Sequence, residues 1–329
     1  MRSGELHSVD HSYYPQSHIG SPLGNVRNAV VLDTPIAPSP ASHSDKATDI
    51  LAYAVRSVEA GVRTALVTLI EIRGGSARPL GAQMVVREDG LYCGYVSGGC
   101  TEAAVAAEAI AALGKGSDRM LLLGEGSPFF DIILPCGGGI TLAIHLLRDS
   151  KAVSTALDKL AARQPVALLY SAAAQRLDIA QEPVETGQYG ESFAISYRPC
   201  PQLMIHGGSL EAAAVERLAK AAGYSVWHRN DAAASAPSID RDTAVVILYH
   251  DIDRERPVLE AALKANPFYI GALGSTRTHE RRCASLRQLG YNQSDLDRIK
   301  APIGIFPKAR SADSLALSIV ADIAASRIA

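Results

Sequence analysis

The chain has 329 residues, of which 47% are hydrophobic, with a formal net charge of -2 and five cysteines. This near-neutral balance offers no bulk attraction for nucleic acid or for an anionic membrane surface. An odd number of cysteines in a chain of this size argues against a disulfide framework and favours a reducing compartment. No apolar run reaches the roughly 18–20 residues that cross a bilayer, and no charged-then-apolar leader is recognisable. We therefore expect a cytoplasmic protein that binds neither nucleic acid nor membrane.

The first 45 residues are rich in Ser, Pro, His and Gly and show little apolar periodicity. This composition predicts a disordered N-terminal extension over residues 1–45. Its four histidines leave a metal-binding tail as an alternative, although their irregular spacing disfavours it. Order is expected to begin with Asp45, which would cap a helix that ends at Ala60 before Gly61.

Residues 46–150 are predicted to form a domain of mixed α+β character. Helix signals cover 101–113, and strand signals cover 64–72, 82–87, 91–96, 120–123 and 140–147. Residues 151–200 are expected to be a connector with its own helix over 153–162 and two strands over 165–171 and 192–198. The segment Pro199-Cys200-Pro201 marks the next boundary.

From residue 201 to residue 329 strands and helices alternate regularly, which predicts a Rossmann-like doubly wound parallel sheet. The expected strands are 203–206, 224–227, 244–249 and 269–273, and the expected helices are 210–222, 257–265, 276–289 and 311–327. The fold class is therefore α/β, with a mixed α+β domain followed by the parallel one.

Two cysteines stand in glycine-rich loops of the first domain. Ser97-Gly98-Gly99-Cys100 precedes a predicted helix, and Cys136-Gly137-Gly138-Gly139 lies between two predicted strands. Glycine lets backbone N–H groups approach a ligand, and a helix N-terminus attracts anions and favours a thiolate. Cys100 and Cys136 are therefore candidate reactive residues, although tight turns with inert cysteines remain the alternative. Two thiols are too few for a closed zinc site, so no metal site is expected.

A third glycine-rich loop carries Arg78 and runs from Gly74 to Gln83. A guanidinium can fork onto phosphate, so Arg78 is a candidate anion ligand, with a solvated surface arginine as the alternative. Glu102, in the first turn of the helix that follows Cys100, would complement the helix dipole.

The second domain carries an incomplete dinucleotide fingerprint. Gly207 and Gly208 follow a strand, but Ser209 stands where the second required glycine belongs, and the next strand ends in Trp227-His228-Arg229-Asn230 without an acidic residue. NAD(P) binding is therefore not expected. The turn that holds Ser275 has good anion geometry, and His206, His250 and Asp251 follow strands at the sheet edge where ligands bind in such folds.

Several of these segments together resemble the XdhC/CoxI family. They are Gly75-Ser76-Ala77-Arg78-Pro79, Gly81-Ala82-Gln83-Met84, Ser97-Gly98-Gly99-Cys100, Leu134-Pro135-Cys136-Gly137-Gly138, Tyr269–Ser275, Ala301-Pro302-Ile303-Gly304 and Leu315–Ile319. The chain departs from the family at its first βα turn, at the end of the next strand, and at Gly304-Ile305-Phe306-Pro307-Lys308, where the family usually has Gly-Leu-Asp-Ile-Gly.

The resemblance implies a chaperone that binds molybdenum cofactor transiently, protects it while a cysteine desulfurase supports its sulfuration, and inserts it into an apo molybdenum hydroxylase of the xanthine dehydrogenase type. The residues expected to handle the cofactor are Arg78, Gln83, Ser97, Gly98, Gly99, Cys100, Cys136, Gly137, Gly138, Gly207, Gly208 and Ser275. The chain would then be an accessory protein rather than an enzyme in its own right, and a homodimer is expected.

Two other classes of function stay open at this point. One is an NAD(P)-dependent oxidoreductase built on the Rossmann-like half, which the altered fingerprint disfavours. The other is a non-catalytic interaction scaffold, in which the glycine loops have only a structural role.

Overall fold

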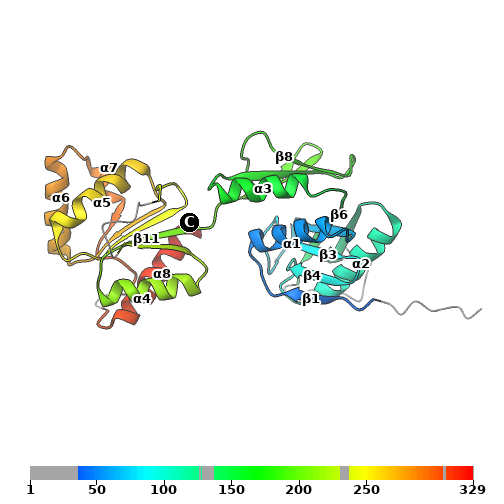
Figure 1. Ribbon diagram of the computed structural model, residues 1–329, viewed down its shortest axis with the longest axis horizontal. Helices are drawn as coiled ribbons and strands as arrows, with labels where there is room; N and C mark the ends of the chain where they lie inside the picture. The colour runs from blue at the N-terminus through cyan, green and yellow to red at the C-terminus, as the bar shows by residue number, and fades with distance from the viewer. Residues whose placement is uncertain (1–35, 126, 128–136, 230–236, 307–308, 329) are drawn as a thin grey trace, which may run out of the picture. The chain divides into compact units, whose positions relative to one another are not determined.

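The computed structural model describes residues 36–125, 127, 137–229, 237–306 and 309–328 (Figure 1). Residues 1–35 of the expected extension lie outside this range. Its last part is a correction, because Ser39–Ser42 form strand β1, which pairs in parallel with β4 (Leu91–Gly94). Ser39 N–H donates to the Gly90 carbonyl at 3.0 Å. A Cβ at Gly90 would lie 2.5 Å from Ile36, so glycine permits this close approach.

The first domain is built on a six-stranded sheet in the order β1-β4-β3-β2-β6-β5. Its other strands are β2 (Thr64–Arg73), β3 (Gln83–Arg87), β5 (Arg119–Gly124) and β6 (Gly139–Leu147). Helix α2 (Glu102–Lys115) packs on one face of the sheet, while α1 (Ala47–Glu59) packs in a second apolar cluster on the other. The main strands and helices expected in this domain are all present.

The expected cap of α1 is wrong. The helix begins after Lys46, which makes no capping bond through its side chain. Asp45 instead forms an ion pair with Arg78, with Oδ2 at 3.1 Å from Nη1. A partner 33 residues away thus replaces the local capping contact that the sequence pattern indicates.

Residues 151–200 form more than a connector. Helix α3 (Lys151–Ala161) accompanies a four-stranded antiparallel sheet in the order β8-β7-β10-β9. Its strands are β7 (Val166–Ser171), β8 (Arg176–Ile179), β9 (Gly187–Tyr189) and β10 (Ser192–Tyr197), of which β8 and β9 were not expected. Side chains of α3, β7 and β10 share one buried apolar cluster with α1 and with Leu66 and Val85 of the first sheet. This segment is therefore part of the packing of the first domain.

The C-terminal half contains the expected parallel sheet, in the order β12-β11-β13-β14-β15. Its strands are β11 (Gln202–His206), β12 (Ser225–Arg229), β13 (Thr243–Ile247), β14 (Tyr269–Ala272) and β15 (Ile299–Lys300). Helices α4 (Leu210–Ala221) and α8 (Ala312–Ile328) pack on one face, while α5 (Ile252–Ala265) and α6 (Thr276–Gln288) pack on the other (Figure 1). A short helix, α7 (Gln293–Asp297), precedes β15.

Helix α5 begins five residues earlier than the pattern suggests. The sequence pattern predicts its start at Pro257. The structure begins it at Ile252, where Asp251 accepts a hydrogen bond from the Asp253 N–H and caps the helix. The side-chain cap thus sets the start, and Pro257 lies inside the helix.

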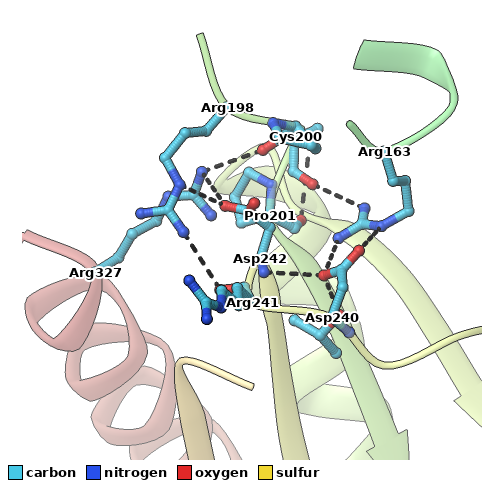
Figure 2. A network of polar contacts seen from close by, with 10 residues as sticks. Arg163, Arg198, Cys200, Pro201, Asp240, Arg241, Asp242 and Arg327 are labelled. Atoms are coloured by element: carbon cyan, nitrogen blue, oxygen red, sulfur yellow. Dashed lines mark hydrogen bonds and ion pairs between the residues drawn. The ribbon is translucent and has the colours of Figure 1, made fainter. Parts of the chain in front are cut away.

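A network of arginines surrounds the boundary segment that leads into β11 (Figure 2). Arg163 forks onto the Asp240 carboxylate at 2.6 and 2.9 Å and donates to the Cys200 carbonyl at 3.1 Å. On the other side of the segment, Arg198 and Arg327 both pair with Asp242. The predicted boundary at 199–201 is therefore held by charge-assisted hydrogen bonds.

Candidate functional site

The three glycine loops of the first domain converge, with the loop from Gly74 to Gly81 in the middle. A Cβ at Gly138 would lie 2.3 Å from the Gly75 carbonyl oxygen. On the other side, a Cβ at Gly98 would lie 3.1 Å from the Ala77 Cβ. The two loops singled out from the sequence therefore lie against the same third loop. We call this arrangement the loop cluster, made of residues 74–81, 97–100 and 137–139.

The cluster depends on glycine at several positions. Gly98, Gly99 and Gly137 have φ values of +88°, +108° and +70°, which side chains rarely tolerate. Cys100 lies in the cluster with an exposed side chain. Cys136, its expected companion, lies outside the described residues. Cys93, on β4, is buried in the core.

The Glu102 carboxylate holds the Ser97–Cys100 loop in its conformation by accepting hydrogen bonds from it. One oxygen accepts the N–H groups of Val96, Ser97 and Gly98 at 2.8–3.2 Å. The other accepts from the Ser97 hydroxyl at 2.7 Å and from the N–H groups of Gly99 and Thr101 at 2.9 and 3.2 Å. Burial disfavours the charged form of Glu102, but these hydrogen bonds outweigh burial, and the pKa of Glu102 lies below its usual range.

Glu102 therefore does more than complement the helix dipole. The N–H groups of residues 97–99, which the sequence suggested as anion ligands, donate to a carboxylate of the same chain. Glu102 is only 2% exposed, so this anion is part of the folded loop. The Cys100 side chain, by contrast, remains on the surface of the cluster.

Arg78 and Gln83 line a cavity of about 170 Å³ next to the cluster. The Gln83 amide oxygen accepts the Tyr197 hydroxyl at 2.6 Å, and its amide nitrogen donates to Thr68 at 3.2 Å. Burial raises the pKa of Tyr197 well above its usual range, so this hydroxyl stays a hydrogen-bond donor. Gln83 is thus a buried wall residue held by two partners.

Arg73 is a residue of the site that sequence reasoning missed. It donates to Glu71 at 2.6 Å, to Thr141 at 2.8 Å and to the Glu125 carbonyl at 3.2 Å. A Cβ at Gly139 would lie 3.0 Å from its guanidinium. Arg73 therefore ties the end of β2 to the start of β6 and holds two of the three loops together. An arginine at the end of an apolar strand carries no local signal for this role.

The first turn of the C-terminal sheet has a structural explanation. Gly207 has a φ of +150°, and a Cβ there would lie 3.1 Å from the Leu248 backbone. Ser209 caps α4 by accepting the Ala212 N–H. His228 lies at the position where an acidic residue was missing, and its ring nitrogens contact the Gly207 carbonyl at 2.6 Å and the Glu216 carboxylate at 2.7 Å. The residues of this turn are thus held by contacts with neighbouring residues of the C-terminal domain.

The remaining candidates of the second domain lie at helix starts or, in the case of His206, at the end of strand β11. Ser275 caps α6 through a hydrogen bond from the Thr278 N–H at 3.2 Å, and Asp251 caps α5. His206 is buried and packs against Trp227. These residues belong to the edge of the parallel sheet, whereas the residues of the loop cluster belong to the first domain.

Comparisons with known proteins agree with this division. Residues 57–124 match the XdhC and CoxI family, and residues 203–323 match the XdhC Rossmann domain. A crystal structure of a xanthine dehydrogenase (BH1974) from Bacillus halodurans has a TM-score of 0.65 and 20% identity, and the match covers 85% of this chain and 95% of that one. At 20% identity, this similarity supports the assignment of the fold alone.

Two proteins of Escherichia coli K12 are similar in sequence. The uncharacterized protein YqeB is 26% identical over 278 residues, which cover 84% of this chain and 46% of YqeB. The molybdenum cofactor insertion chaperone PaoD is 52% identical over 293 residues, which cover 88% of this chain and 92% of PaoD. With matches in both halves and this identity over nearly its whole length, the chain belongs to the XdhC and CoxI family.

Proposed function

We propose that this protein is a molybdenum cofactor chaperone, which binds the cofactor at the loop cluster and inserts it into a molybdenum hydroxylase of the xanthine dehydrogenase type. The observation that carries the proposal is the convergence of three glycine loops, of which one carries an exposed thiol and another an arginine, in a chain 52% identical to the insertion chaperone PaoD. The cofactor is cargo, which the protein must hold and also release.

The chemistry of the cluster suits such cargo. The cofactor combines a phosphate with a metal held by soft sulfur ligands. Cys100 offers a soft ligand on the surface of the cluster, while Arg78 offers a fixed cation for the phosphate. The glycines leave the backbone bare, so a flat pterin ring can lie close to it. Arg73 and Glu102 would hold these loops in position.

The finer parts of the proposal concern partners and compartment. We propose that a cysteine desulfurase supplies sulfur to the bound cofactor and that the chaperone acts as a homodimer, the commonest symmetric assembly. The described cysteines, Cys93, Cys100, Cys200 and Cys283, are all free thiols, which suits a reducing cytoplasm. Within the described residues, no helix is long and apolar enough to cross a membrane.

The test compares cofactor retention by Cys100→Ala, Cys200→Ala and the parent protein. Each protein is loaded with molybdenum cofactor without oxygen and passed through a desalting column. Molybdenum and the oxidised, fluorescent pterin are then measured for each chain. Cys200 is a matched control because it is also exposed but belongs to the boundary segment.

We expect Cys100→Ala to retain about tenfold less cofactor, which corresponds to about 1.4 kcal/mol of binding free energy. Cys200→Ala should retain as much as the parent. Equal retention by all three proteins would remove Cys100 from the site. A parent protein that retains no cofactor would refute the chaperone function itself.

A further inference from the structure

The cavity next to the loop cluster has walls that suit a small anionic group. It measures about 170 Å³, and a single water needs roughly 10–15 Å³ of such space. Its polar wall residues include Gln83, Thr186, Ser196 and Tyr197, and Arg78 is the cation among its lining residues. Gly81 allows this fit, because a Cβ there would lie 2.7 Å from Thr186.

The Arg78 guanidinium is only partly satisfied. Its Nη1 donates to Asp45, whereas its Nε is buried and has no hydrogen-bond partner among the described residues. A guanidinium offers five N–H donors in a planar fork that matches the oxygens of a phosphate or carboxylate. A buried donor that lacks a partner among the described residues, in a side chain that lines a cavity, indicates room for a further acceptor.

Asp45 is the chain's own anion at this position, and it is weakly held. Its side chain is 60% exposed, and Arg78 is its ion-pair partner at 3.1 Å. The neighbouring acid Asp49 differs, because it accepts the Ser44 hydroxyl at 2.7 Å. An exposed carboxylate with one long contact can move aside, since water takes over its hydrogen bonds.

We infer that this cavity is an oxyanion site for a phosphate group and that Asp45 is its internal competitor, displaced when phosphate binds Arg78. Gln83 and Tyr197 are polar lining residues of the site, and Arg78 supplies its charge. The inference deepens the proposed function in one respect only: with that function, the phosphate is the one carried by the cofactor. Binding at the site can be measured with inorganic phosphate, in the absence of the cofactor.

The experiment is a calorimetric titration of the cargo-free full chain with inorganic phosphate, in a buffer free of other oxyanions. Asp45→Asn should bind phosphate roughly two- to fivefold more tightly than the parent, because the variant loses a competing surface ion pair. Arg78→Gln should bind about tenfold more weakly or not at all. Asp49→Asn is the matched control, since it removes the same charge from the same segment, and it should bind like the parent.

Circular dichroism and a thermal melt check that each variant is folded, and the two aspartate variants suffice if Arg78→Gln does not fold. Equal affinity in Asp45→Asn and Asp49→Asn would overturn the competitor role. If millimolar phosphate binds neither the parent nor Asp45→Asn, the proposal that this cavity is a phosphate site is wrong.

A second arm distinguishes the source of the phosphate. If the phosphate of the cofactor occupies the cavity, protein loaded with molybdenum cofactor should no longer bind inorganic phosphate. If loaded protein still binds it with unchanged affinity, the site serves free phosphate, and the assignment to the cargo is wrong. Failure to retain cofactor at all would affect the proposed function and leave the phosphate titration standing.

Discussion

Glu102→Gln is the sharpest test of how the cysteine loop is built. The substitution keeps the size of the side chain but replaces one carboxylate oxygen by an amide NH2 group. One oxygen can still accept the N–H groups of Val96, Ser97 and Gly98. The NH2 group would then face the N–H groups of Gly99 and Thr101, and two donors cannot bond to each other.

The expected cost follows from these two displaced donors. A buried donor left without an acceptor costs about 1–3 kcal/mol. The Thr101 N–H keeps the Ser97 hydroxyl as a second acceptor at 3.0 Å, so its loss falls at the lower end. The charge that strengthens the remaining bonds is also lost. We therefore expect Glu102→Gln to lower the free energy of unfolding by roughly 2–4 kcal/mol.

Denaturant unfolding followed by circular dichroism measures this loss, with Glu108→Gln as the control. Glu108 lies on the same helix α2, and its carboxylate pairs with Arg119, with both side chains half-buried. A single ion pair that water still reaches contributes about 1 kcal/mol or less. If Glu102→Gln is no more destabilising than Glu108→Gln, the carboxylate does not organise the loop. Alkylation of Cys100 should also change in rate in Glu102→Gln alone, because only that variant disturbs the loop that carries the thiol.

The same variant predicts a pH dependence with a definite sign. The pKa of Glu102 is lowered in the folded protein, so its contribution to stability is present above the unfolded value of about 4.3. That contribution is lost as the pH falls through the lower, folded value. The difference in unfolding free energy between parent and Glu102→Gln should therefore be constant from about pH 5 to 8 and shrink below about pH 4. A difference that grows on acidification would contradict the assignment.

Two further predictions concern the C-terminal half. Glu255→Gln should destabilise the protein by about 3–5 kcal/mol in denaturant unfolding, because it leaves Arg282, which is 1% exposed, without its buried counter-ion; a loss below about 1 kcal/mol would show that the pair is dispensable. Titration with NAD or NADP should show no binding at about micromolar concentration, since Ser209 places a side chain where the pyrophosphate requires bare backbone; a micromolar dissociation constant that is lost in Gly207→Ala would refute this prediction.

Local patterns were sufficient for most of the fold. The parallel sheet follows from apolar strands at regular spacing, and α2 follows from its alanine-rich run, although the helix continues past the expected end at residue 113 to Lys115. The strands that the patterns missed are β1, β8, β9 and β15, which have four, four, three and two residues. Strands this short carry little local signal and are stabilised by the neighbour with which they pair. That neighbour is distant in sequence for β1 and β15, whereas β8 and β9 pair across a tight turn with the adjacent strands β7 and β10.

The candidate site could be predicted in part. Glycine loops with a thiol were visible because glycine is expensive in ordinary turns, and two loops of the three lie against the loop that carries Arg78. The partners of the charged groups were not visible. Asp45 precedes a helix and looks like its cap, yet it pairs with Arg78, and Glu102 looks like a dipole partner, yet it collects the N–H groups of the preceding loop. Such roles depend on the path of the backbone, which residue type and spacing do not specify.

The two carboxylates at the cluster differ in a way that bears on cargo release. Glu102 is 2% exposed and accepts from six donors, so no ligand can replace it without unfolding the loop. Asp45 is 60% exposed, and its ion-pair partner among the residues that the structure describes is Arg78, so a ligand can exchange with it. A carrier needs both properties, because its loops must keep their shape when empty while its ligand contacts must be reversible. An internal anion that returns to Arg78 as the cargo leaves would lower the energetic cost of release.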